Sequence, residues 1–160
     1  MGCHHCKGVL AYCHRWGFGC EKDEARSLEL ARESSGRGSR YGQIDIGELH
    51  YLGEGGLAED YAQAVAIFWL AAAQRLDLAQ FSLGCMYFNG NGVAKDRKEG
   101  LRWFQLAAAQ GYPEALYYVA SCHEHGYGVR GNMAAAILWY NRAQAAGNIE
   151  AAAVLQRLGA

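Results

Sequence analysis

The stretch SLGCMYFNGNGVAKD, residues 82–96, decides the fold of this chain. It carries a glycine pair one residue apart, which resembles a phosphate-binding loop. Such loops follow a strand and precede a helix. The residues before Gly90 instead have the three-and-four spacing of an amphipathic helix, with Leu83, Met86 and Tyr87 on one face. The spacing predicts a helix end followed by a turn.

The same glycine pair occurs four times at a regular distance. Its first glycine stands at Gly17, Gly53, Gly90 and Gly126, with spacings of 36, 37 and 36 residues. The longer step contains the additional glycine of GEGG, residues 53–56. A nucleotide site is not normally built four times in one short chain, whereas a period in the mid-thirties is typical of stacked helical hairpins. The glycine pair is therefore interpreted as a repeated structural joint.

The residues around each joint repeat as well. Three residues before the first glycine stand His14, His50, Tyr87 and His123, and an apolar residue follows the second glycine at Cys20, Leu57, Val93 and Val129. Good N-cap residues come next, at Asp23, Asp60, Asp96 and Asn132. Gln63 and Glu99 stand where a capping box needs them. Each joint is thus predicted to end one helix and begin the next.

The pattern predicts an all-α fold, an α/α solenoid of four helical-hairpin repeats of about 36 residues plus a C-terminal capping helix. The second helices of units two to four carry an aromatic or apolar pair, such as Trp103/Phe104, followed by small residues. Each first helix opens with a small residue, at Cys6, Gly42, Ala79 and Ala115. The predicted units are residues 5–38, 41–76, 78–112 and 114–147, with the cap at 148–160, and together they form a single domain over 1–160.

Composition excludes several classes of function. Apolar residues make up 51% of the chain and charged residues 19%, which is typical of a globular protein. A net charge of -1 gives no basic surface for nucleic acid. No apolar run approaches the roughly 18 to 20 residues of a membrane span. The N-terminus lacks the layout of a signal peptide, and we expect a cytoplasmic protein.

Units three and four carry a specific motif. It consists of YYVASCHEHGYGV, FSLGCMYFNGNGV, the capping aspartate, Trp103, the AAAQG run and Ala115. This motif resembles the Sel-one-like repeat family, a relative of the tetratricopeptide repeats, over nearly the whole chain. The second unit departs by its extra glycine and by Ile67 in place of tryptophan, and the first by Leu30 at that position.

The resemblance implies a right-handed, curved solenoid that acts as an adaptor or scaffold for partner proteins. It also implies that the chain has no catalytic activity of its own and needs no cofactor. A cysteine-rich secreted branch of the family has disulfides between the two helices of each repeat and is linked to β-lactam hydrolysis, which stays as an enzymatic alternative. That disulfide pattern is excluded here, because the second helices contain no cysteine.

The N-terminal cysteines suggest a different function. Cys3 and Cys6 have a spacing common in zinc sites, and Cys13 or Cys20 could complete four ligands. A thiol-redox site is the other interpretation. The repeat pattern favours a structural role, since buried free cysteine behaves as a small apolar side chain. A small zinc-binding or thiol-redox domain therefore remains the alternative to an adaptor.

A binding site is expected on the first helices, where the repeated positions vary. In a solenoid these helices line the concave surface. The predicted contact residues are Tyr12, Trp16, Asp45, Glu48, Leu52, Ser82, Asn89, Tyr118, Ser121 and His125. Their order gives an aromatic end, an acidic middle and a second aromatic end. This arrangement suits an extended or helical peptide with a basic centre.

Two further features complete the sequence-based predictions. Trp69 shares its repeat position with polar residues and is an outer-surface candidate for anchoring a partner. His123 and His125 could form half of a metal site, although His123 occupies the position of Tyr87 and is more simply a packing residue. The expected partner is another protein or peptide segment, with no nucleic acid and no membrane span, and self-association is a further option.

Overall fold

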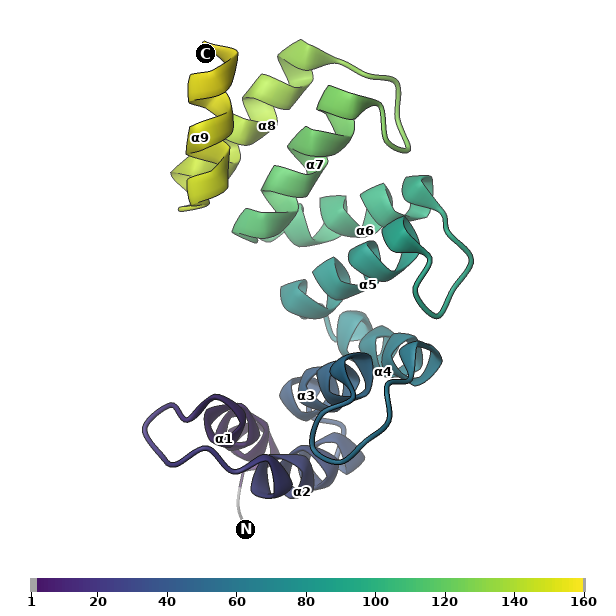
Figure 1. Cartoon of the computed structure of the whole chain (residues 1–160), viewed down its shortest axis with the longest axis vertical. Helices are drawn as coiled ribbons and strands as arrows, with labels where there is room; N and C mark the ends of the chain where they lie inside the picture. Colours follow the sequence, from purple (N-terminus) through teal and green to yellow (C-terminus); the bar gives the residue numbers. More distant parts are fainter. Residues whose placement is uncertain (1–2, 160) are drawn as a thin grey trace. The chain divides into compact units, whose positions relative to one another are not determined.

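The computed structural model describes residues 3–159, and all regular structure within them is α-helical (Figure 1). The first helices of the four repeats are α1 (His4–Trp16), α3 (Arg40–Leu52), α5 (Asp77–Asn89) and α7 (Pro113–His125). The second helices are α2 (Glu24–Gly36), α4 (Tyr61–Ala73), α6 (Arg97–Ala109) and α8 (Met133–Ala145), and α9 (Ile149–Leu158) follows them. The predicted all-α repeat fold is confirmed.

The joints are built as the sequence predicts. The first glycine of each pair ends its helix in the left-handed conformation, with φ of 73° at Gly17 and 85° at Gly90, which glycine adopts at little cost. Each predicted cap residue accepts a hydrogen bond from a backbone N–H of the following helix. The Asp96 carboxylate, for example, accepts bonds of 2.9 and 3.0 Å from the N–H groups of Lys98 and Glu99.

A backbone hydrogen bond closes every one of these loops. The N–H of the cap residue donates to the carbonyl oxygen of the residue three positions before the first glycine. The four bonds, at 2.8 to 2.9 Å, join Asp23 to His14, Asp60 to His50, Asp96 to Tyr87 and Asn132 to His123. The loop with the extra glycine closes in the same way as the others.

The first helices begin two residues earlier than the small residues that were predicted to open them. Their first residues are His4, Arg40, Asp77 and Pro113. Local capping explains the difference. The Ser39 hydroxyl accepts a hydrogen bond from the N–H of Gly42, and Pro113 supplies a first-turn residue that needs no backbone N–H partner. The small residues lie within the first turn.

The chain forms two compact units, Met1–Ala79 and Gln80–Ala160. The first unit contains a buried cluster of Ala11, Leu30, Ala31, Ile46 and Leu49. A larger cluster in the second unit is built from α6, α7, α8 and α9 and includes the fully buried rings of Phe104 and Tyr140.

Glycines on the first helices make room for aromatic rings of the second helices. A Cβ atom at Gly47 would lie 2.4 Å from Cε1 of Phe68, and one at Gly84 would lie 2.4 Å from Cδ1 of Phe104. Both distances are far below van der Waals contact, so these rings pack directly on the backbone of the neighbouring helix. In the second and third repeats, this pairing of a glycine with a large ring sets the close approach of the two helices.

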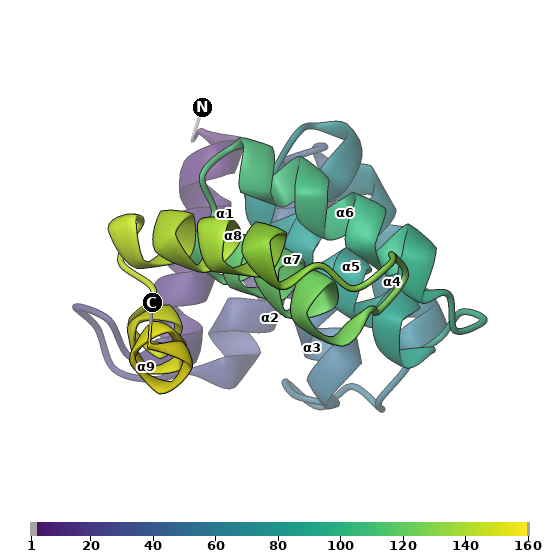
Figure 2. The same cartoon turned by 90° about the horizontal axis from the view of Figure 1, so that it is seen from above.

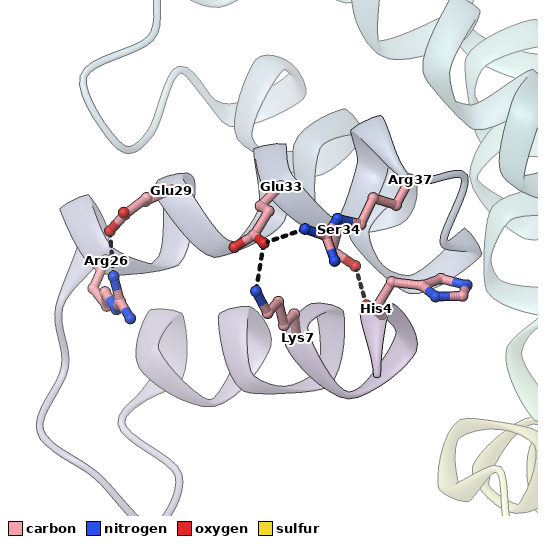
Figure 3. Close-up of polar contacts among 7 residues, drawn as sticks. All are labelled: His4, Lys7, Arg26, Glu29, Glu33, Ser34 and Arg37. Carbon is pink, nitrogen blue, oxygen red and sulfur yellow. Dashed lines mark hydrogen bonds and ion pairs between the residues drawn. The ribbon is translucent and has the colours of Figure 1, made fainter. Parts of the chain in front are cut away.

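Polar contacts hold α1 against α2 (Figure 3). Lys7 pairs with Glu33, which also accepts a bond of 3.1 Å from Arg37. The buried hydroxyl of Ser34 donates to the carbonyl oxygen of His4 at 2.6 Å. Serine at this position, where the other repeats carry alanine, is therefore satisfied by the backbone of the partner helix.

In the second unit, α8 packs against both α7 and α9 (Figure 1 and Figure 2). The Tyr140 hydroxyl on α8 donates to Glu124 on α7 at 2.6 Å. The same carboxylate accepts a hydrogen bond of 2.8 Å from Arg157 on α9. One carboxylate therefore links the last three helices.

Candidate functional site

Three aromatic side chains form an exposed aromatic cluster at the end of α1. Tyr12 and Trp16 lie one helical turn apart with their ring centroids at 6.3 Å, and Tyr12 stacks on Phe18 at 5.9 Å. The exposed fractions of Tyr12, Trp16 and Phe18 are 43%, 51% and 59%. The cluster therefore presents a large apolar area to solvent while its rings support one another.

A groove of about 240 Å³ lies beside this cluster, and we call it the α1–α3 groove. Its lining residues are Gly8, Val9, Tyr12, Tyr41, Ile44, Asp45 and Leu78. Tyr12 belongs to both features and makes them continuous. The small Gly8 lets α1 approach α3, because a Cβ atom there would lie 2.7 Å from the backbone nitrogen of Gly42. Most of the lining is apolar, and Asp45 supplies a carboxyl group.

Among the described residues, Asp45 is the only predicted contact residue that is buried. The exposed fraction of its side chain is 2%. Its carboxyl group has a pKa raised from 3.8 to about 8, chiefly because it is removed from water and in smaller part because Glu48 is near, while Arg15 acts in the opposite direction. Within residues 3–159, its Oδ2 atom has no hydrogen-bond partner. A buried carboxyl oxygen without a partner is costly in a folded protein.

The sequence interpretation missed Arg15, which organises the acidic residues near the groove. Its guanidinium is buried, donates through Nη1 to Glu48 and donates through Nε to Glu54 at 3.0 Å. Burial still raises the pKa of Glu48, although Arg15 acts in the opposite direction. Arg15 and its two partners are 33 and 39 residues apart, close to one repeat period, and that spacing of opposite charges was the available signal.

The second unit presents a mixed surface on α7. The Tyr118 ring is partly exposed and contacts the rings of Phe81 and Phe104, with centroids 5.4 and 5.0 Å away. His125 is exposed, and its Nδ1 atom lies 3.0 Å from the carbonyl oxygen of Ser121. The three predicted residues of this helix therefore lie along one accessible strip, since they are spaced three and four residues apart.

The remaining predicted contact residues lie at different depths. Leu52 and Asn89 are exposed, whereas Glu48 and Ser82 are partly buried. Trp69 is 42% exposed on α4, as its repeat position suggested. Among the predicted residues, the structure brings Tyr12 into contact with Trp16 and Ser121 into contact with His125.

Among the N-terminal cysteines, Cys3 contacts Cys6, and Cys20 contacts His14 instead of another cysteine. Cys3 caps α1, and its sulfur accepts a hydrogen bond of 3.3 Å from the N–H of Cys6. Hydrogen bonds from the side chain and backbone of Cys6 lower the pKa of the Cys3 thiol. Cys20 Sγ lies 3.7 Å from Nδ1 of His14. All six cysteines are free thiols, and no three His, Cys, Asp or Glu side chains in residues 3–159 come together as metal ligands. The zinc interpretation gains no support.

The other two cysteines, Cys85 and Cys122, are not expected to be reactive thiols. Burial raises the pKa of Cys85 to about 12 and that of Cys122 to about 11. Both side chains stay neutral thiols near neutral pH, and neither has the thiolate character of a catalytic nucleophile. They pack with the apolar residues of the second unit.

None of the helices in the described part of the chain has the length and apolar character needed to cross a lipid bilayer.

Comparison with known structures found several similar helical-repeat proteins. A protective antigen of uropathogenic Escherichia coli strains that displays an SLR fold is 33% identical, with a TM-score of 0.84 over 94% of this chain and 32% of the antigen. A Sel1 repeat protein from Oxalobacter formigenes is 26% identical, with a TM-score of 0.85 over 93% of this chain and 59% of its own. The chain thus spans about a third and about three-fifths of these two proteins.

Cysteine rich protein B of Helicobacter pylori shares the fold at 16% identity, with a TM-score of 0.65 over 84% of this chain and 96% of its own. A comparison with curated proteins gave no match. The sequence profile of the Sel1 repeat matches four successive segments, residues 9–39, 40–75, 77–112 and 113–148. These four matches cover most of the sequence, and the chain belongs to the Sel1 repeat family.

Proposed function

We propose that this chain is a non-catalytic interaction module that binds a segment of another protein on the first helices of its repeats. Sel1 repeat proteins are commonly protein–protein interaction scaffolds, and generally they are not enzymes. The observation that carries the proposal is the aromatic cluster of Tyr12, Trp16 and Phe18, which stays exposed beside the α1–α3 groove. Exposed apolar patches next to a groove are typical of interaction sites.

Aromatic side chains are effective anchors for a partner. They bury a large area while losing few rotatable bonds, and they are enriched among residues that dominate binding energy. In the cluster, Trp16 is already held by Tyr12 and by the guanidinium of Arg15, which lies 5.1 Å from the Trp16 ring centroid. A ring that is positioned before binding costs less entropy to immobilise.

On the second unit, we propose that Tyr118, Ser121 and His125 contribute a further contact strip. Tyr118 offers an aromatic face, while Ser121 and His125 offer hydrogen-bonding groups one turn further along α7. A partner segment that lies along α7 would meet the aromatic ring first and the polar groups next. Each strip can be tested by itself.

A reducing, cytoplasmic compartment is part of the proposal. Cys3 and Cys6 are exposed thiols on the first turn of α1, and Cys3 has a lowered pKa. Such a pair would be oxidised readily outside a reducing environment.

The test is an affinity capture from matched lysate, read by mass spectrometry, with the native chain and three variants. The double variant Tyr12→Ala/Trp16→Ala removes the cluster, and Tyr118→Ala removes the aromatic group of the second strip. Leu138→Ala on α8 is the matched control, because Leu138 is an exposed apolar residue (67%) on a second helix. Circular dichroism must show equal helicity for all four proteins.

We expect the native chain and Leu138→Ala to capture the same partner proteins. The double variant should fail to capture them. Equal recovery by the native chain and both first-helix variants would contradict binding on the first helices. A parallel Trp69→Ala variant shows whether the outer surface of α4 is used instead. Loss with that variant alone would move the site there.

A further inference from the structure

The α1–α3 groove combines apolar walls with one carboxyl group, and this combination specifies a ligand. The walls come from Val9, Tyr12 and Ile44 together with Tyr41 and Leu78. Asp45 is the acidic residue of the lining, and it is almost fully buried. An apolar ligand would fill the walls but leave the carboxyl group unsatisfied, so the groove calls for a ligand with an apolar stem and a hydrogen-bond donor at its end.

The protein itself does not satisfy this carboxyl group. Oδ2 of Asp45 has no partner in the described chain. Arg15, the cation that acts on it electrostatically, donates through Nε and Nη1 to Glu54 and Glu48, and its Nη2 atom is likewise buried without a partner in the described chain. Glu48 and Glu54 therefore outnumber the one buried cation with which they pair, and the region favours an added positive charge.

We propose that the groove binds the side chain of a lysine in the partner segment, with Asp45 accepting a hydrogen bond from its ammonium group. The proposal rests on the proposed function, since it names what the interaction module recognises. The four methylenes of lysine would lie along the apolar walls, as long charged side chains do on apolar surfaces. The rings of Tyr12 and Tyr41 add favourable contacts for a cation.

Lysine suits this groove better than arginine. The guanidinium carries five N–H donors in a fixed fork and pairs best with two free carboxylate oxygens. Asp45 has one oxygen without a partner, in a lining otherwise formed by glycine and apolar or aromatic residues. A compact ammonium needs only one such acceptor. Because Oδ2 is buried, the Asp45 side chain must turn toward the groove to meet it, and the remaining ammonium donors then face the open side, where water can accept them.

Binding of an ammonium is coupled to loss of a proton from Asp45. Burial holds the carboxyl group largely protonated near neutral pH in the free protein, while the lysine complex requires the carboxylate. The charged and titratable groups around Asp45 are Arg15 from α1, Glu48 on α3, Glu54 in the following loop and the hydroxyls of Tyr12 and Tyr41, and α5 contributes the apolar Leu78. Affinity should therefore rise as pH increases from about 6 to about 8.

The experiment is a selection of random 12-residue peptides displayed on phage against the native chain and against Asp45→Asn. The asparagine variant keeps the shape of the side chain and removes its ability to ionise. We expect a consensus with a lysine flanked by apolar residues from the native chain and loss of that lysine from the consensus against Asp45→Asn. A native consensus without lysine, or one that Asp45→Asn retains, overturns the lysine site while leaving the proposed function standing.

Failure to select any peptide on the native chain would instead overturn the proposed function together with the lysine site. The selected peptide is then synthesised with lysine, norleucine or trimethyl-lysine and titrated by fluorescence polarisation. Norleucine keeps the stem without charge, and trimethyl-lysine keeps the charge without a donor. We expect both to bind about 10- to 100-fold more weakly than lysine, as loss of a hydrogen bond to a charged group predicts.

These peptide titrations use the native chain, so they decide the question even where Asp45→Asn folds poorly. Equal affinity for lysine and norleucine peptides would overturn the proposal. The same titration at about pH 6 and pH 8 should show tighter lysine binding at the higher value, by roughly tenfold per pH unit below the pKa of Asp45. The norleucine peptide, which does not need the carboxylate, should lack this dependence.

Discussion

Gly47 is a position at which one methyl group should decide the stability of the first unit. A Cβ atom there would lie 2.4 and 2.6 Å from two ring carbons of the buried Phe68. Because the ring is enclosed, the two helices must separate to admit the methyl group. We expect Gly47→Ala to lower the free energy of unfolding by about 1 to 3 kcal/mol in urea titrations.

The matched control is Gly36→Ala. Gly36 is also helical, but a Cβ atom at that position meets nothing within 4 Å. Alanine there should leave the free energy of unfolding unchanged or raise it by up to about 1 kcal/mol, because alanine has the higher helix propensity. Similar losses for both variants would show that the contact with Phe68 is unimportant.

Asp45 should make the stability of the first unit depend on pH. Its pKa is raised from 3.8 to about 8 on folding, so the folded state holds this proton more tightly than the unfolded state. The stabilisation of the folded state by this bound proton is complete below the ordinary pKa of the carboxyl group. It is lost as pH rises through about 8. Burial also raises the pKa of Glu48, which acts in the same direction.

We therefore expect the native chain to lose stability between about pH 5 and about pH 8, and Asp45→Asn to lose less. Urea titrations of the two proteins across this range measure the difference. The variant should gain most, relative to the native chain, at the upper end. A constant difference between the two proteins at every pH would show that Asp45 keeps its ordinary pKa in the folded state.

At the scale of the element, the N-cap of α6 contributes to stability through local hydrogen bonds that a single substitution can remove. The Asp96 carboxylate accepts hydrogen bonds from two backbone N–H groups that the helix itself cannot satisfy. Asp96→Ala should reduce the free energy of unfolding by about 1 kcal/mol, whereas Asp96→Asn should retain most of it. Thermal unfolding of both variants gives the comparison. An equal loss for both variants would mean that the negative charge, and not the cap geometry, stabilises the helix start.

Helix joints were predictable from sequence because their chemistry is local. The left-handed glycine and the cap residue lie within a few positions of each other, so the pattern at Asp60 or Asp96 determines where the next helix begins. The starts of the first helices were two residues off because the apolar pattern marks the packed residue, while Ser39 and Pro113 set the actual beginning.

The candidate site was only partly predictable, for a physical reason. Asp45 occupies the repeat position of Val9 and Tyr118, both of which are exposed. Its burial depends on the neighbouring helices α1 and α5, which contribute Val9 and Leu78 to the groove lining. The sequence of the repeat that contains Asp45 does not show which residues these neighbours place beside it. The ion pairs of Arg15 were missed for the same reason, since they join adjacent repeats.

At the scale of the whole molecule, each compact unit has its own buried residues, and destabilisation should stay largely local. Repeat proteins derive stability from individual repeats and their immediate neighbours. In hydrogen-exchange measurements on Gly47→Ala, we expect protection to fall more in α3 and α4 than in α7 and α8. A uniform fall across all helices would show that the chain unfolds as one cooperative body.

The backbone bond that closes each joint also explains how these chains can change length. In the second joint the cap residue Asp60 still donates to His50 at 2.8 Å, although this loop holds one glycine more than its counterparts. The number of residues in the loop therefore does not affect where the two helices lie, because this hydrogen bond fixes both ends of the loop. The tips are accordingly natural places for inserted segments, and an epitope or a fluorophore attached there should leave the packing of the helices undisturbed.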